Sequence, residues 1–107
     1  MVEIIDGPIL KKWIDAGKEM IIADARASEE YEKAHIPGAV SLLIAELETR
    51  ADSVLRKGVP IVTYSEDEDC PAKKILAEKL EKMGYKPVYA YDGSYADWVK
   101  LGYPIEK

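Results

Sequence analysis

The sequence predicts an α/β fold, with a mainly parallel central sheet of about five strands flanked by helices on both faces. Short apolar runs alternate with amphipathic segments along the whole 107-residue chain. The run at residues 20–23 is apolar throughout, which is typical of a strand buried on both faces. Four amphipathic segments are followed by a glycine that can end a helix: Gly17, Gly58, Gly84 and Gly102. A chain of this length predicts one domain, residues 1–107.

The first half of the chain predicts six elements. We expect an edge strand, a helix, a buried strand, a short helix, a brief strand and a longer helix, at residues 2–5, 8–16, 20–23, 28–34, 40–42 and 43–55. Pro8 suits the first position of a helix, because the N–H that it lacks would have no partner there. Ser28 is placed to cap the short helix.

The second half repeats the pattern. We expect a strand, a helix, a strand and a last helix that follows the turn at 92–94, at residues 60–64, 71–83, 88–91 and 95–101. The helix at 71–83 is the clearest of these. One lysine, at position 79, interrupts its apolar stripe, which consists of Ile75, Leu76, Leu80 and Met83.

Composition limits the classes of function. With 15 basic and 20 acidic residues the net charge is −5, which argues against nucleic acid and anionic membrane as partners. No apolar run approaches 18 residues and no signal pattern begins the chain, so we expect a soluble, cytoplasmic protein. One cysteine allows no internal disulfide and fits a reducing compartment. The absence of Asn and Gln resembles thermophile usage; chance or design is the alternative.

Chemically interesting residues follow three predicted strands. In parallel sheets, ligands sit beyond the carboxyl ends of the strands. The segments at these ends are residues 24–26, 65–70 and 92–94. They are the candidate segments for a ligand site.

Four segments carry a family pattern. They are Asp24-Ala25-Arg26, then Glu30-Tyr31 with His35-Ile36-Pro37-Gly38-Ala39, then the strand, loop and helix of residues 61–84, and last Tyr91-Asp92-Gly93-Ser94 with Trp98 and Gly102-Tyr103-Pro104. In order and spacing they resemble the rhodanese-like sulfurtransferase domains, with Ser94 in place of a glycine. The resemblance covers nearly the whole chain. It implies a rhodanese-like fold, and structural roles for Asp24, His35, Gly38, Gly93 and Trp98.

The resemblance also identifies the position of the nucleophile. In active members a cysteine that carries a persulfide directly follows the central strand, and that position is Ser65 here. A hydroxyl is a much weaker acid than a thiol and would need a neighbouring base. The single histidine, His35, lies in a segment with an implied structural role. Ser65 is therefore predicted to be chemically inert.

Cys70 is the alternative nucleophile. Together with Pro71 it resembles the second Cys-Pro that some members carry in a longer loop. Near the start of a helix, the dipole and free N–H groups lower the pKa of a thiol. Neighbouring carboxylates raise it, so the direction of the net shift stays open.

Acidic residues dominate the same loop. Glu66, Asp67, Glu68 and Asp69 would repel thiosulfate and other anionic sulfur donors, or they form a solvated loop at a helix N-terminus. The run has no glycine at a Ca²⁺-loop position, so we predict no metal and no cofactor. Arg26 is expected to pair with these acids or a bound anion, or to form a salt bridge, for example with Glu30. These acids and Arg26 are the candidate binding residues.

We therefore predict a rhodanese-like protein with absent or weak sulfur-transfer activity, because Ser65 replaces the nucleophilic cysteine. It would act as a binding or regulatory module for a small sulfur-containing anion or a partner protein. Two alternatives stay open: an active sulfurtransferase that forms a persulfide at Cys70, and an engineered Cys-to-Ser variant of an active enzyme. Related phosphatases use a Cys-x5-Arg loop, whose arginine position falls on Pro71, so phosphatase activity is not expected.

Overall fold

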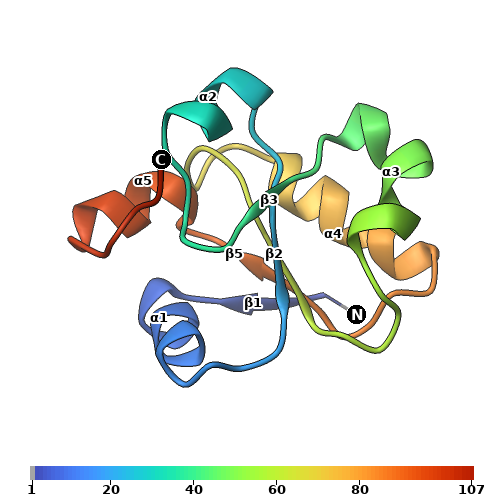
Figure 1. Ribbon diagram of the computed structural model, residues 1–107, viewed down its shortest axis with the longest axis horizontal. Coiled ribbons are helices and arrows are strands. Elements are labelled where there is room, and N and C mark those ends of the chain that lie inside the picture. Colours follow the sequence, from blue (N-terminus) through green and yellow to red (C-terminus); the bar gives the residue numbers. More distant parts are fainter. Residues whose placement is uncertain (1) are drawn as a thin grey trace.

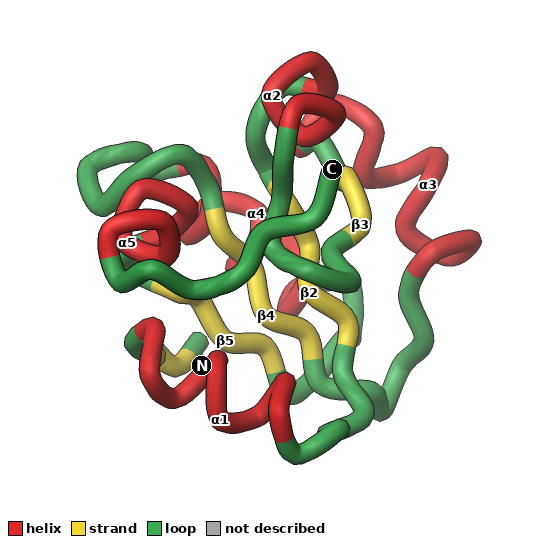
Figure 2. Tube along the Cα trace, turned by 60° about the vertical axis from the view of Figure 1, so that its left-hand side comes forward, coloured by secondary structure: helices red, strands yellow, loops and turns green. Residues whose placement is uncertain are grey.

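A five-stranded sheet forms the centre of the computed structural model, which describes residues 2–107 (Figure 1). Its strands are β1 (Glu3–Ile5), β2 (Ile21–Asp24), β3 (Val40–Ser41), β4 (Ile61–Tyr64) and β5 (Val88–Tyr91). They lie in the order β1-β5-β4-β2-β3, and every pair is parallel. Figure 2 shows β5, β4 and β2 side by side in the middle of the molecule. The predicted α/β fold with a parallel sheet is thus confirmed.

Helices cover both faces of this sheet (Figure 1). They are α1 (Gly7–Asp15), α2 (Ser28–Lys33), the 3-10 turn η1 (Ile44–Glu46), α3 (Leu47–Val54), α4 (Ala72–Lys82) and α5 (Ser94–Lys100). The helices α3 and α4 pack on one face, while α1 and α5 pack on the other. Right-handed crossovers between parallel strands place successive helices on the two faces in this way.

The central strand β4 connects two cores. Ile61 packs among the residues of α3 and α4, whereas Val62 and Tyr64 pack toward α1 and α5. All four residues of β4 are buried. Successive side chains of a strand point to opposite faces, so a central strand covered on both sides needs a continuous apolar run. The same requirement explains the apolar sequence of β2.

Two local predictions were wrong. The side chain of Ile75 is 40% exposed, and the buried face of α4 consists instead of Lys73, Leu76, Ala77 and Leu80. Ser28 is the first residue of α2 and not its cap, since the cap position is Ala27 and makes no side-chain hydrogen bond. In α4, a lysine takes a core position because its ammonium finds partners among backbone carbonyls.

Candidate functional site

Three loops meet at the carboxyl edge of the sheet, because β4 lies between β5 and β2. The loop at residues 65–71 leaves β4 and leads into α4. Its Ser65 and Glu66 carbonyls accept hydrogen bonds from the N–H groups of Tyr95 (3.1 Å) and Ala96 (2.9 Å) in α5. On the other side, the N–H of Ala25 donates to the carbonyl of Tyr64 at 2.9 Å. The start of the loop is thus held between its two neighbours.

Ser65 is fully buried, and its polar groups are occupied. Its N–H donates to the Ser94 hydroxyl oxygen at 3.0 Å, and its own hydroxyl donates to the Cys70 carbonyl at 3.2 Å. The two serine hydroxyl oxygens lie 3.5 Å apart, and the Ser94 hydroxyl donates to the Tyr91 carbonyl at 3.0 Å. The Ser65 hydroxyl is therefore placed as a hydrogen-bonding group at the base of the loop.

Cys70 is partly exposed, and the loop favours its ionised form. Burial on its own raises the pKa of the thiol. Hydrogen bonds from the backbone of Ala72, the Ser65 hydroxyl and the backbone of Glu66, together with the charge of Lys73, outweigh burial and hold the pKa below its ordinary value. The net shift of the Cys70 pKa, whose direction the sequence left open, is thus downward. The thiol is the more acidic and the more accessible of the two candidate nucleophiles.

Two side chains of opposite charge organise the loop backbone. The Asp67 carboxylate accepts hydrogen bonds from the N–H groups of Asp69 (3.1 Å) and Cys70 (3.0 Å). The Lys73 ammonium donates to the carbonyls of Asp67 (2.9 Å), Glu68 (3.1 Å) and Cys70 (2.9 Å). Sequence reasoning missed Lys73. The sequence did contain a signal: Lys73 lies three residues before Leu76 and seven before Leu80, which places it on the same face of the helix as these apolar residues.

The four acids of the loop, residues 66–69, are all exposed. Glu66 approaches Arg26, with 3.9 Å between Oε1 and Nη1. Asp67 is engaged with the loop backbone as described. Glu68 lines a hollow of about 400 Å³ that is also bordered by Asp6, Asp92 and Asp97. Negative charge therefore lines this hollow beside the loop.

Arg26 braces the fold through Asp24. Its Nη2 lies 2.9 Å from Asp24 Oδ2 and donates to the Ala34 carbonyl at 2.6 Å. The guanidinium carbon lies 4.0 Å from the centre of the Tyr95 ring. The proposed partner Glu30 was wrong, since Asp24 pairs with Arg26 and the loop acid Glu66 also lies at ion-pair distance from it. Asp24 also accepts the Arg26 N–H at 2.8 Å, and so closes the turn that leaves β2.

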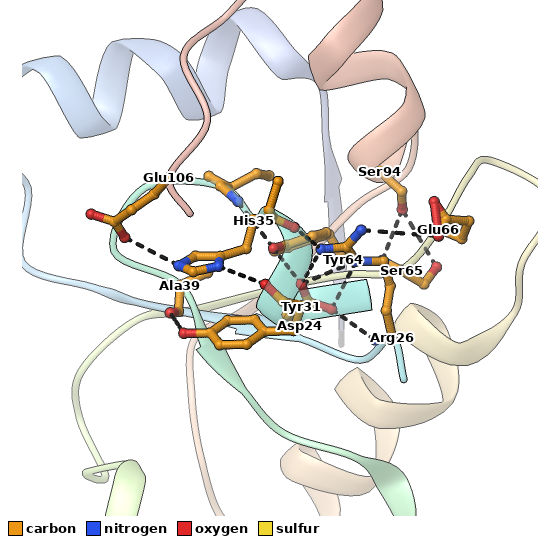
Figure 3. A network of polar contacts seen from close by, with 12 residues as sticks. Asp24, Arg26, Tyr31, His35, Ala39, Tyr64, Ser65, Glu66, Ser94 and Glu106 are labelled. Atoms are coloured by element: carbon orange, nitrogen blue, oxygen red, sulfur yellow. Dashed lines mark hydrogen bonds and ion pairs between the residues drawn. The ribbon is translucent and has the colours of Figure 1, made fainter. Parts of the chain in front are cut away.

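His35 lies at the opposite end of this polar network from Ser65 (Figure 3). Its Nδ1 lies 2.9 Å from the Tyr31 carbonyl and its Nε2 lies 3.2 Å from Glu106 Oε1. Its ring stacks on that of Tyr31, with 4.0 Å between the centres. Both ring nitrogens are engaged with groups other than Ser65, so His35 is not placed as a general base for it.

The remaining motif residues shape the turns around the site. Gly38 has φ 82°, and its N–H donates to the Glu106 carboxylate at 3.0 Å. A Cβ atom at Gly93 would lie only 2.5 Å from the Cβ of Asp97. Trp98 is fully buried, and its indole N–H donates to the Pro104 carbonyl at 2.7 Å. These contacts join α5 and the C-terminal segment to the edge where the loop lies.

Two other kinds of site are absent from residues 2–107. No group of three or more His, Cys, Asp or Glu side chains in this range is arranged to hold a metal ion. None of the helices formed by these residues is long and apolar enough to cross a membrane.

Comparison with known proteins identifies the family. The family model described as "Rhodanese-like domain" matches residues 8–101. YrkF of Bacillus subtilis, to which a sulfur-carrier role is ascribed, is 33% identical over 89 residues, which are 82% of this chain and 46% of YrkF. The thiosulfate sulfurtransferase GlpE of Coxiella burnetii is 28% identical over 81 residues, which are 76% of this chain and 73% of GlpE.

A solved structure has the same fold. The BH2092 protein of Bacillus halodurans superposes with a TM-score of 0.90 at 28% identity, covering 97% of this chain and 76% of that one. The chain spans about half the length of YrkF, so the likeness concerns one domain of that protein. The fold, the matched residues and the two named relatives agree, and the chain therefore belongs to the rhodanese-like domain family, which relates it to sulfurtransferases and sulfur carriers.

Proposed function

We propose that this domain carries sulfane sulfur as a persulfide on Cys70, and that the Ser65 hydroxyl, which donates to the Cys70 carbonyl in this structure, turns to donate to that sulfur. One observation supports this most strongly: Cys70 is partly exposed, and although burial raises the pKa of its thiol, the backbone of Ala72, the Ser65 hydroxyl, the backbone of Glu66 and the charge of Lys73 hold that pKa below its ordinary value. Such donors stabilise a thiolate and also the persulfide anion that replaces it. Ser65 occupies the position where the family resemblance expects the nucleophile, and Cys70 takes over that role.

The proposed reaction is a simple displacement. The Cys70 thiolate attacks the outer sulfur of a donor persulfide, RS–SH, and a new bond forms between Sγ and that sulfur. The S–S bond of the donor breaks, and its electron pair leaves with the thiolate RS⁻. Transfer to an acceptor thiolate reverses these steps and returns Cys70 to its starting form. No oxidant or reductant is consumed.

The exposed acids disfavour anionic donors. Thiosulfate carries two negative charges and must approach a thiolate beside Glu66, Asp67, Glu68 and Asp69. Each like-charge pair about 4 Å apart costs about 1 kcal/mol even in water. We therefore expect weak activity with thiosulfate, and better transfer from donors of lower negative charge.

A second candidate is a non-catalytic binding or regulatory module, in which the same loop holds a small sulfur-containing anion or a partner protein. The burial of Ser65 and its occupied hydroxyl favour this candidate, because the usual nucleophile position then has no reactive group. The two candidates differ in one respect. Only the first requires a covalent sulfur adduct on Cys70.

Intact-protein mass measurement separates the candidates. The protein is incubated with an alkyl persulfide or with thiosulfate, and the mass is compared before and after. Because the chain has one cysteine, a gain of one sulfur atom reports on Cys70 directly. We expect the gain with the persulfide, its loss in Cys70→Ser, and its reversal by a thiol reductant. An unchanged mass with both donors would favour the binding module.

The Ser65→Cys variant tests the role of position 65. If Ser65 stands where a working cysteine belongs, this variant gains sulfur even when Cys70 is replaced by serine. If only Cys70 is placed to react, the double variant Ser65→Cys, Cys70→Ser stays unmodified. The buried location of Ser65 supports the second result.

A further inference from the structure

Lys73 is a buried cation that family resemblance did not predict. Only 1% of its surface is exposed, although it lies in the first turn of α4. The other buried residues of this helix, Leu76, Ala77 and Leu80, are apolar. Burying a charge is costly unless it finds good partners, so a cation here needs a physical reason.

The partners of Lys73 belong to the loop that carries Cys70. Its ammonium has three N–H groups, and these meet the carbonyls of Asp67, Glu68 and Cys70 at 2.9, 3.1 and 2.9 Å. The Lys73 backbone is itself held to the sheet, because its carbonyl accepts the Thr63 hydroxyl at 2.9 Å. The lysine therefore links the loop to β4 through the start of α4.

The positive charge of Lys73 is not neutralised by direct pairing. In the described part of the chain, no carboxylate lies within ion-pair distance of its ammonium. The loop acids project outward to solvent instead. Inside the loop, the Asp67 carboxylate accepts N–H groups while Lys73 binds carbonyls. The buried charge of Lys73 is therefore balanced by backbone carbonyls of the loop and not by a paired carboxylate.

We propose that Lys73 is a positioning residue for Cys70. Its ammonium holds the loop in the form that presents the thiol to the backbone donors, and its charge stabilises the thiolate. The first part depends only on the geometry above. The second part extends to the persulfide anion and, to that extent, rests on the proposed function.

The test is the pH dependence of Cys70 alkylation by iodoacetamide, a neutral reagent that reports the thiolate fraction. We compare the wild type with Lys73→Met, which keeps the length of the side chain and removes the charge. Lys79→Met is the matched control, because Lys79 is exposed on the same helix. The other charges near the loop stay unchanged in these variants: Arg26, Glu66, Asp67, Glu68, Asp69, Lys74, Asp92 and Asp97.

We expect the apparent thiol pKa to rise in Lys73→Met, and the alkylation rate at pH 6 to fall about threefold to tenfold. Lys79→Met should keep the wild-type profile. A purely structural lysine would lower the urea midpoint of Lys73→Met but leave the profile of the folded protein unchanged, and that result would overturn the proposal.

Two further variants keep the test decisive if Lys73→Met does not fold. Lys73→Gln retains N–H donors without the charge, and should also raise the thiol pKa. Lys73→Arg retains the charge and should keep the thiol pKa low. An equal rise in both would show that the charge is irrelevant to the thiol. If Lys73→Gln shifts the profile while the wild type forms no persulfide, the positioning role stands and the proposed function fails.

Discussion

Ser94 provides a sharp test of how the site is held together. It is fully buried with φ 62°, a conformation that favours glycine, and the family pattern has glycine at this position. Its hydroxyl accepts the Ser65 N–H and donates to the Tyr91 carbonyl, both at 3.0 Å. The serine thus combines an unfavourable backbone conformation with two hydrogen bonds that join the ends of β4 and β5.

The two contributions can be separated by two substitutions. Ser94→Ala keeps the backbone penalty and leaves the buried Ser65 N–H without a partner, so it should cost about 2 kcal/mol of unfolding free energy. Ser94→Gly loses the same bonds but relieves a penalty of about 1–2 kcal/mol. Glycine also makes the unfolded chain more flexible, which lowers the free energy of unfolding again by about 0.4–1 kcal/mol. We therefore expect Ser94→Gly to be the more stable variant, by about 0.5–1 kcal/mol.

Urea unfolding, followed by tryptophan fluorescence, measures both variants, since Trp98 is fully buried in the same helix, α5. Ser53 supplies the matched control, because it lies exposed in the regular helix α3. In a helix interior, alanine is favoured over glycine by about 1 kcal/mol. The order of the two substitutions should therefore reverse between positions 53 and 94. A Ser94→Gly protein less stable than Ser94→Ala would refute the reasoning.

Three further predictions concern the thiol, the loop acids and the C-terminal segment. Ser65→Ala removes a hydrogen bond that lowers the pKa of Cys70, so the alkylation profile of the thiol should move to higher pH; an unchanged profile would show that the hydroxyl does not act on the sulfur. Asp69→Asn should raise the rate of sulfur uptake from thiosulfate by less than about fivefold, and should leave the rate with a neutral donor unchanged. High salt should remove the gain. A gain that persists in high salt contradicts the electrostatic explanation. The backbone hydrogen bond from Gly38 holds the pKa of Glu106 below its ordinary value, and His35 adds to this effect. The stabilising effect of Glu106 is therefore present above the ordinary carboxyl pKa and is lost as the pH falls through the lowered pKa of Glu106. In Glu106→Gln, the free energy of unfolding should fall less steeply as the pH is lowered. An identical fall in the two proteins argues against this contact.

Much of the fold is predictable because burial on both faces leaves a clear trace in the sequence. The runs at β2 and β4 are continuous and apolar since each has helices on both sides. The order of strands and helices then restricts the connections, and parallel strand ends must meet at one edge. The meeting of residues 24–26, 65–70 and 92–94 follows from topology alone.

The internal arrangement of the loop was not predictable in the same way. Lys73 is buried because its partners are backbone carbonyls, and a sequence pattern shows side chains only. Arg26 pairs with Asp24, two residues before it, because the turn after β2 folds the two side chains together; Glu30 had been the expected example of a partner. In each case the partner is determined by the path of the main chain.

The relation between Ser65 and Cys70 is the main mechanistic point. Four residues separate them, yet the Ser65 hydroxyl donates to the Cys70 carbonyl and also helps to lower the pKa of the Cys70 thiol. A loop that returns onto its own first residue brings both positions to one set of backbone donors. Under the proposal, the reactive sulfur can therefore stand at position 70 instead of position 65 without loss of those donors. The buried Ser65 then contributes a hydrogen bond in place of a nucleophile, and Cys70 gains the exposure that a sulfur donor needs.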